Sequence, residues 1–182
     1  MALVKKRFVV SMLLAFFICS MASAFAAETA KFIIYQNEAC DFKMDYPEGW
    51  IRVTEGFMIT AATFYAKPES VSDFPASINI SVWDVSKYPR MTLDAEGKGS
   101  ILAWEKTVAD FQLISKEKCS LSGDPAIIYI YDGKEGTHNF RRTEAHILHN
   151  NTLYMIVFAS EKAQLDKYQE VGEGIINSFM IY

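Results

Sequence analysis

The side chains best suited to chemistry are four on or beside one expected hairpin: His138, Glu144, His146 and His149. The first three share a parity, so in an extended strand they would project from one face. Glu144 and His146 are close enough to bind one metal ion, but His138 lies about 26 Å away along an ideal strand. A catalytic zinc ion usually takes three protein ligands. We therefore expect a solvated polar strand face without a metal, and an ordinary surface histidine at position 149.

Nucleophilic catalysis has no recognisable signature in the chain. No serine lies in a G-x-S-x-G elbow, and no histidine has a recognisable setting beside a serine. The run Gly97-Lys98-Gly99-Ser100 is too short for a phosphate-binding loop and falls inside an expected helix. Asp132 and Glu135 do not match the spacing of a calcium loop. We expect no enzymatic activity, no bound metal and no cofactor.

Two cysteines, Cys40 and Cys119, are candidates for a disulfide bond. A third, Cys19, lies in an N-terminal apolar stretch that we expect to be removed. Cys40 shares a strand face with Phe42, and Cys119 shares one with Leu121, so both sulfur atoms are expected to face apolar layers. A bond requires the two strands to be neighbours, because the Cα atoms must approach to about 4.4–6.8 Å. The alternative is two separate buried thiols.

Trp83 is the candidate contact residue of the chain. It lies on the opposite parity from Ile78, Ile80 and Val82 in a strand expected over Ser77–Val85. A covering helix would make this side chain part of the core. If no element covers it, an exposed tryptophan would mark a contact site for a partner.

The periodicity of apolar residues predicts the elements that position these side chains. Alternation predicts seven or eight strands, and helical spacing predicts two helices. The strands are expected at 42–46, 51–55, 57–66, 77–85, 111–121, 126–131, 137–149 and 152–159. The first helix is expected at 93–108, with Thr92 as its N-cap. The second helix is expected after Ser160, which is a candidate for its cap. The last helix carries an apolar stripe of Leu165, Tyr168, Gly172, Ile175, Ile176 and Phe179. Short turns such as Asn150-Asn151 indicate a largely antiparallel sheet, and both helices need an apolar surface to cover. These features predict an α+β sandwich with helices packed on the sheet.

The N-terminus has the three parts of a secretory signal peptide. Lys5-Lys6-Arg7 precedes an apolar stretch from Phe8 to Met21, and Ala24-Phe25-Ala26 is a cleavage site. We expect a signal peptide at 1–26 and a single domain at 27–182, exported to the periplasm or the extracellular space. No later segment approaches ~18 consecutive apolar residues, so the mature chain should contain no transmembrane segment.

The charge of the mature chain argues against nucleic acid as a partner. The whole chain has 18 Lys+Arg against 22 Asp+Glu, and the expected signal removes three basic residues and no acidic ones, which leaves a net charge of −7. Binding to phosphate groups needs a basic face. The same charge opposes an electrostatic hold on anionic lipid. It is compatible with cation binding, but we favour the simpler explanation, that the charge keeps an exported protein soluble.

Four motifs in the chain resemble the PsbP-like family. They are Phe42 through Tyr46-Pro47-Glu48-Gly49-Trp50, Leu121-Ser122-Gly123-Asp124-Pro125-Ala126 running into Tyr131, Asn151-Thr152-Leu153-Tyr154, and Ile175 to Phe179. Their order and spacing fit across nearly all of 40–182. The resemblance implies a three-layer α/β/α sandwich around a largely antiparallel sheet. It also implies a non-enzymatic role in binding and supporting larger assemblies.

These observations together predict an exported, non-enzymatic PsbP-like domain that binds another protein outside the cytoplasmic membrane. The identity of that partner does not follow from the sequence. One alternative is a small-ligand or metal-binding protein of the same compartment, which a deep apolar pocket with convergent polar groups would favour. A second is a hydrolase assembled from residues distant in sequence, which a cluster of serine, histidine and acid would favour. A flat exposed aromatic patch would favour the protein partner.

Overall fold

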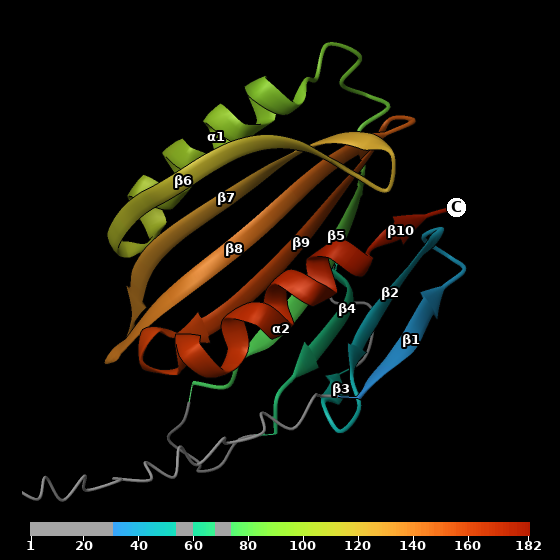
Figure 1. Ribbon diagram of the computed structural model, residues 1–182. Coiled ribbons are helices and arrows are strands. Elements are labelled where there is room, and N and C mark those ends of the chain that lie inside the picture. Colours follow the sequence, from blue (N-terminus) through green and yellow to red (C-terminus); the bar gives the residue numbers. More distant parts are fainter. Residues whose placement is uncertain (1–30, 54–59, 68–73) are drawn as a thin grey trace, which may run out of the picture.

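The computed structural model describes residues 31–53, 60–67 and 74–182. A seven-stranded antiparallel sheet has the order β3-β4-β5-β9-β8-β7-β6, and a three-stranded antiparallel sheet has the order β1-β2-β10 (Figure 1). The strands of the large sheet are β3 (Ile51–Val53), β4 (Thr60–Tyr65), β5 (Ser77–Asp84), β6 (Ala109–Leu121), β7 (Asp124–Glu135), β8 (His138–His149) and β9 (Thr152–Glu161). The small sheet consists of β1 (Phe32–Asn37), β2 (Phe42–Pro47) and β10 (Met180–Ile181). The helices are α1 (Leu93–Thr107) and α2 (Leu165–Ser178), the latter preceded by the short 3₁₀ helix η1 (Lys162–Gln164).

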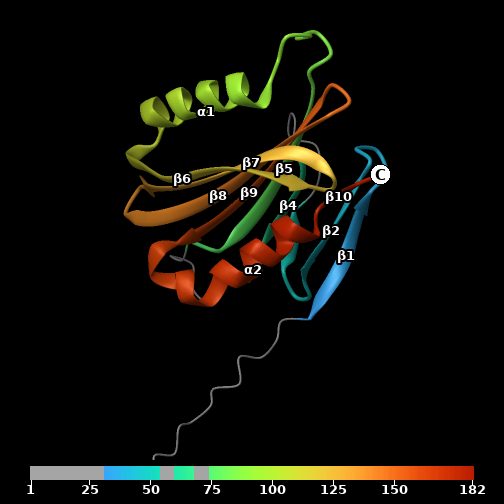
Figure 2. The same cartoon turned by 45° about the horizontal axis from the view of Figure 1, so that its top comes forward.

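The strand register shows that the two helices contact opposite faces of the large sheet. Tyr129, Glu144 and Val157 are register partners on one face, and α1 lies over part of that face. Ile130, Thr143 and Phe158 are partners one residue along, so they point to the other face, where α2 packs. The small sheet lies on the same side as α2 (Figure 2). An α+β fold with a large antiparallel sheet and two helices is therefore confirmed.

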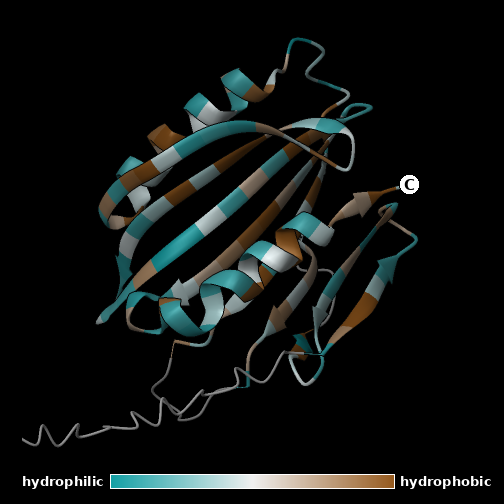
Figure 3. Ribbon diagram, viewed as in Figure 1, coloured by the Kyte–Doolittle hydropathy of each residue, from teal (hydrophilic) through white to brown (hydrophobic). Residues whose placement is uncertain are grey.

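The main hydrophobic core lies between the large sheet and the layer of α2 and the small sheet. Ile175, Ile176 and Phe179 are buried there, as the predicted stripe requires, and Phe179 stacks on Phe42 with a centroid distance of 5.1 Å. Gly172 lets the helix approach the sheet, because a Cβ there would lie 2.4 Å from the ring of Phe158. Figure 3 shows strongly apolar residues near the C-terminal end of α2 and the changes between apolar and polar residues along β6, β7 and β8.

The two helix starts differ from each other. Thr92 caps α1 as predicted, since its hydroxyl accepts a hydrogen bond from the backbone N–H of Ala95 at 3.2 Å. The predicted cap at Ser160 is wrong. Strand β9 continues to Glu161 and η1 follows, so α2 begins only at Leu165. The Ser160 hydroxyl is buried and finds no hydrogen-bond partner in the described part of the chain.

The N-terminal predictions lie outside the described residues. This applies to the signal peptide expected at 1–26 and to the first residues of the domain expected at 27–182, which the structure describes from residue 31 onward. None of the helices in the described segments has the length and apolar character needed to cross a membrane.

The predicted Asn150-Asn151 turn is confirmed, and both residues adopt positive φ angles, 45° and 62°.

Candidate functional site

A charged cluster lies buried between α1 and the large sheet. His146 on β8 is 1% exposed, and its two ring nitrogens face two different carboxylates. Nδ1 lies 2.7 Å from Oε2 of Glu96 on α1, and Nε2 lies 3.3 Å from Oε2 of Glu144 on β8. The hydroxyl of Tyr131 donates a hydrogen bond to Oε1 of Glu144 at 2.5 Å, and that of Ser100 donates to Oε1 of Glu96 at 2.5 Å. One histidine thus joins a helix to the strand beneath it.

The electrostatics of this cluster favour a charged imidazolium. Burial by itself would lower the pKa of His146, but its hydrogen bonds to Glu144 and Glu96 and the charges of both carboxylates raise it to about 9. Burial alone would raise the pKa of Glu96, because it disfavours the charged carboxylate. The hydrogen bond from His146 outweighs this effect and holds the pKa of that carboxyl below its ordinary value. Both ring N–H groups of His146 donate hydrogen bonds and the two carboxylates accept them, so both donors of the imidazolium are satisfied.

This geometry does not suit a metal ion. Glu96 and Glu144 bind opposite edges of one imidazole ring, so their oxygen atoms cannot converge with it on a single point. Within residues 31–53, 60–67 and 74–182, no group of three His, Cys, Asp or Glu side chains is placed to hold a metal. The ring is also unsuited to general-base catalysis, because both nitrogens are occupied and solvent is excluded.

The structure corrects the expected environment of Glu144 and His146. They share a face, as parity predicts, but they are buried rather than solvated because α1 lies over them. His138 is separate and faces Glu161 at 3.1 Å. His149 is partly exposed at the hairpin and faces Asp124 at 2.8 Å. Sequence reasoning missed Glu96, for which the only available signal was an acid in the first turn of a predicted helix.

Aromatic rings and one glycine complete the contact beneath α1. Trp104 stacks on Tyr131 with a centroid distance of 4.7 Å and meets Tyr129 edge-on at 5.3 Å. Gly97 is the only buried residue of α1, and the backbone passes directly over the Tyr129 hydroxyl. That hydroxyl is buried and has no hydrogen-bond partner among the described residues. Burial and the charge of Glu96 raise the pKa of Tyr129 to about 12.

Trp83 is 42% exposed, so no described element covers it fully. In the strand register, Trp83 on β5 lies opposite Leu153 on β9, and Leu153 lies opposite Leu148 on β8. The three side chains therefore form one row across the sheet, on the face that α1 contacts. The segment 85–92 leaves β5 beside this row and projects from the end of the sheet before α1 begins (Figure 1). Its Tyr88 is 62% exposed. Two aromatic side chains are therefore exposed at this end of the molecule.

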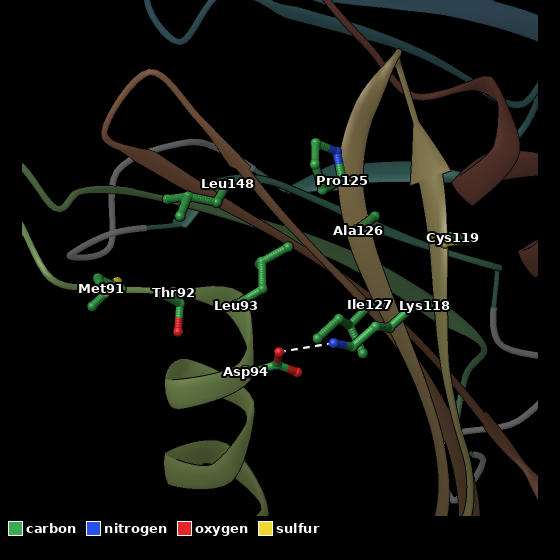
Figure 4. Close-up of a pocket in the computed structure, with 10 residues that line it drawn as sticks. All are labelled: Met91, Thr92, Leu93, Asp94, Lys118, Cys119, Pro125, Ala126, Ile127 and Leu148. Carbon is green, nitrogen blue, oxygen red and sulfur yellow. Dashed lines mark hydrogen bonds and ion pairs between the residues drawn. The ribbon is translucent and has the colours of Figure 1, made fainter.

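An apolar hollow of about 360 Å³ opens between the start of α1 and strands β6 to β8. Figure 4 shows Leu93 pointing from the first turn of α1 toward the strands, with Ile127 and Leu148 among the residues around it. The only ion pair drawn there joins Lys118 Nζ to Asp94 Oδ2 at 2.8 Å. A second hollow, of about 430 Å³, lies between segment 85–92 and α1. Met91 lines both hollows.

We call this region the end surface, defined by Trp83, Lys87, Tyr88, Arg90 and the walls of the first hollow. Within it, the backbone of segment 85–92 is held by turns rather than by regular structure. Val85 N–H donates to the Asn151 carbonyl of the β8–β9 turn, and Tyr88 and Met91 N–H groups donate to the carbonyls of Val85 and Tyr88, all at 2.8 Å. The end surface is thus a concave, partly apolar region beside two exposed aromatic side chains.

Cys40 and Cys119 are free thiols in the structure. The strand adjacency that a disulfide would require is not found among the described residues, because β2 pairs there with β1 and β10, whereas β6 pairs with β7. Cys40 lies in the turn before β2, and Cys119 is exposed on the edge strand of the large sheet. Partial burial and a neighbouring acid, Asp41 or Glu117, raise the pKa of each thiol above its ordinary value. Bond formation in the exported protein stays a prediction.

Comparison with protein families identifies one match, to the model described as PsbP-like protein, over residues 20–181. No curated protein sequence matches the chain.

Several solved structures share the fold. The solution structure of cyanobacterial PsbP (CyanoP) from Synechocystis sp. PCC 6803 matches with a TM-score of 0.64 and 14% identity, over 89% of this chain and 99% of that one. LpqN, described as involved in cell envelope biogenesis of Mycobacterium tuberculosis, matches with a TM-score of 0.57 and 11% identity, over 85% and 86%. The Saccharomyces cerevisiae Ran-binding protein Mog1p matches with a TM-score of 0.58 and 8% identity, over 84% and 96%. At these identities the likeness establishes the fold.

Proposed function

Because the chain belongs to the PsbP-like protein family, we propose that it is an exported, non-enzymatic protein that binds another protein outside the cytoplasmic membrane. The end surface is the proposed contact region. The observation that carries this proposal is the exposure of Trp83 and Tyr88, 42% and 62%, beside an apolar hollow. Large aromatic side chains left in water next to an apolar concavity are typical of surfaces that a partner covers.

The environment of His146 supports a role without catalysis. It is the most deeply buried of the three described histidines, and two carboxylates hold its ring. The serine hydroxyl described in this cluster, that of Ser100, donates its hydrogen bond to Glu96 rather than to His146. A serine hydrolase needs a histidine that can take a proton from a serine within hydrogen-bond reach. This cluster instead fastens α1 to the sheet.

A small-ligand function is the weaker alternative. The first hollow is apolar, but it lies open beside the helix. The two charged side chains described in its walls, Lys118 and Asp94, pair with each other rather than point toward a ligand. A specific small-molecule site usually adds several convergent polar groups to an enclosed apolar cavity.

Two relatives in fold give the proposal context. LpqN is described as acting in cell envelope biogenesis, and Mog1p as binding Ran. Both descriptions concern those proteins, and they place this fold in one protein involved in cell envelope biogenesis and in one that binds another protein. We also propose the three-layer α/β/α description for this chain, with the small sheet sharing the layer of α2. Export through a signal peptide at 1–26 is part of the same proposal.

Site-specific cross-linking tests the proposed function. A photo-crosslinking amino acid replaces Trp83 in the exported protein, and the matched control carries it at Tyr182, which is 53% exposed and follows β10 in the small sheet. We expect a discrete cross-linked species from position 83 and none from position 182 in cells that express the chain at its normal level. Absence of such a species at position 83, or the same species from both positions, would contradict the proposal.

A further inference from the structure

The acidic side chains around the end surface have cationic or hydrogen-bonding partners within the described chain. Asp94 pairs with Lys118 at 2.8 Å, and Asp124 pairs with His149 at 2.8 Å. Glu96 faces the charged ring of His146 at 2.7 Å. Asp84 accepts a hydrogen bond from the backbone N–H of Ser86 at 2.8 Å. The negative charge of this region is therefore largely engaged inside the molecule.

Two cations of the end surface, Lys87 and Arg90, lie in the projecting segment 85–92 and are exposed. No hydrogen bond or ion pair joins either of them to a residue that the structure describes. The hydrogen bonds from Ser86 and the charge of Lys87 together lower the pKa of Asp84, so Lys87 is balanced in part and Arg90 is the cation without a neighbouring acid in the described part of the chain. The segment between β5 and α1 thus presents two exposed positive charges that form no ion pair among the described residues, on a chain whose overall charge is negative. Two exposed cations without salt bridges, beside exposed aromatic rings, favour a partner that carries carboxylates.

The hollows place an apolar contact next to these charges. Arg90 lines the second hollow, and its chain neighbour Met91 lines both hollows. An apolar side chain in the first hollow would rest against Leu93, Ile127 and Leu148. A carboxylate one or a few residues away along the same segment could then reach Arg90, whose planar fork suits a carboxylate.

We propose that the end surface binds an acidic segment of the partner protein, with an apolar side chain in the first hollow and carboxylates against Arg90 and Lys87. This inference rests on the proposed function and specifies the chemistry of the partner. A membrane surface is the less favourable occupant. An anionic membrane would face a broad area of an acidic molecule and would be repelled by it. A short segment responds only to charges within about one Debye length, ~8–10 Å at ordinary ionic strength, and therefore to Arg90 and Lys87.

Peptide titration tests this proposal independently of any cellular partner. The probe is a short synthetic peptide of Asp, Glu, Leu and Phe, and the comparison peptide has Lys in place of every acid. Binding to the mature protein is followed by NMR at low and high salt. We expect the acidic peptide to shift the resonances of Trp83, Arg90 and Leu93, to bind about tenfold more tightly than the basic peptide, and to weaken at high salt.

Charge reversal provides the matched variants. Lys87→Glu with Arg90→Glu should weaken binding of the acidic peptide about tenfold, since two attractive contacts become repulsive. Lys106→Glu with Lys134→Glu changes the net charge equally, at the opposite end of α1 and of the sheet, and should leave binding unchanged. Equal binding of the two peptides, an equal loss in the control variant, or binding to vesicles of anionic phospholipid in place of the peptide would overturn the proposal.

The cross-linking assay separates this inference from the proposed function. If the species formed from position 83 persists in the Lys87→Glu/Arg90→Glu background, a partner exists but its acidic character is refuted. If position 83 yields no species in any background, the proposed function fails, and the peptide titration still decides whether the end surface selects acidic segments.

Discussion

Gly97→Ala should detach the start of α1 from the sheet. An ideal Cβ at Gly97 would lie 1.7 Å from the Tyr129 hydroxyl oxygen and 2.9 Å from Cζ of the same ring. Tyr129 is fully buried and packed against Trp104, so its ring cannot swing away cheaply. The helix must move instead, and that movement also stretches the contact between Glu96 and His146.

Gly99 offers a matched control two residues along the same helix. A Cβ there would meet nothing within 4 Å. Gly99→Ala should therefore stabilise the protein by up to about 1 kcal/mol through helix propensity. The same propensity gain applies at Gly97, but overpacking typically costs about 1–3 kcal/mol, and the weakened ionic contact adds to that cost. We expect a net loss of about 1–2 kcal/mol for Gly97→Ala.

Urea unfolding of the mature protein, followed by circular dichroism, measures both effects. Tyr129→Phe supplies a further check, because the hydroxyl it removes has no hydrogen-bond partner among the described residues and should cost little by itself. In that background Gly97→Ala should be less damaging by at least about 1 kcal/mol, a coupling typical of residues in contact. Equal shifts for Gly97→Ala and Gly99→Ala, or no rescue by Tyr129→Phe, would refute the reasoning.

Three further predictions concern the charged cluster, the core and the thiols. The pKa of His146 is raised from 6.5 to about 9, so its stabilising contribution is complete below pH 6.5 and is lost as pH rises toward 9. The free energy of unfolding should fall over that window, by about 3 kcal/mol at most, and His146→Gln should remove the slope; a slope retained in that variant would contradict the assignment. Phe179→Ala should cost about 3–5 kcal/mol, because its ring is 2% exposed and stacks on Phe42; an unchanged urea midpoint would show that the α2 stripe is misread. Titration in denaturant without reductant tests the disulfide predicted between Cys40 and Cys119: one bond per chain would confirm it, and two free thiols, the state in the structure, would contradict it.

Short-range pattern was sufficient for much of the fold. Alternation at Ile78, Ile80 and Val82 identified the buried face of β5, and all but Val82 of these are fully buried. Helical spacing identified the buried stripe of α2, where Ile175 and Ile176 pack against the sheet. The small sheet was missed, since β1 was not predicted and β10 has only two residues. A two-residue strand carries no period that a pattern could reveal.

The sequence by itself determined which side chains share a strand face, because that follows from the two-residue period of an extended backbone. It placed Glu144 and His146 on the same face of one strand, and Trp83 on the face of its strand opposite to that of Ile80. What covers a face is decided by contacts between distant segments. Glu96 reaches His146 across 50 residues of chain, and this contact converts an expected solvated pair into a buried ionic link. No helix covers Trp83 in the same way, because α1 lies over β6, β7 and β8 and leaves the end of β5 open. The tertiary structure alone therefore separated the buried charged cluster, which links α1 to the sheet, from the aromatic surface that stays exposed.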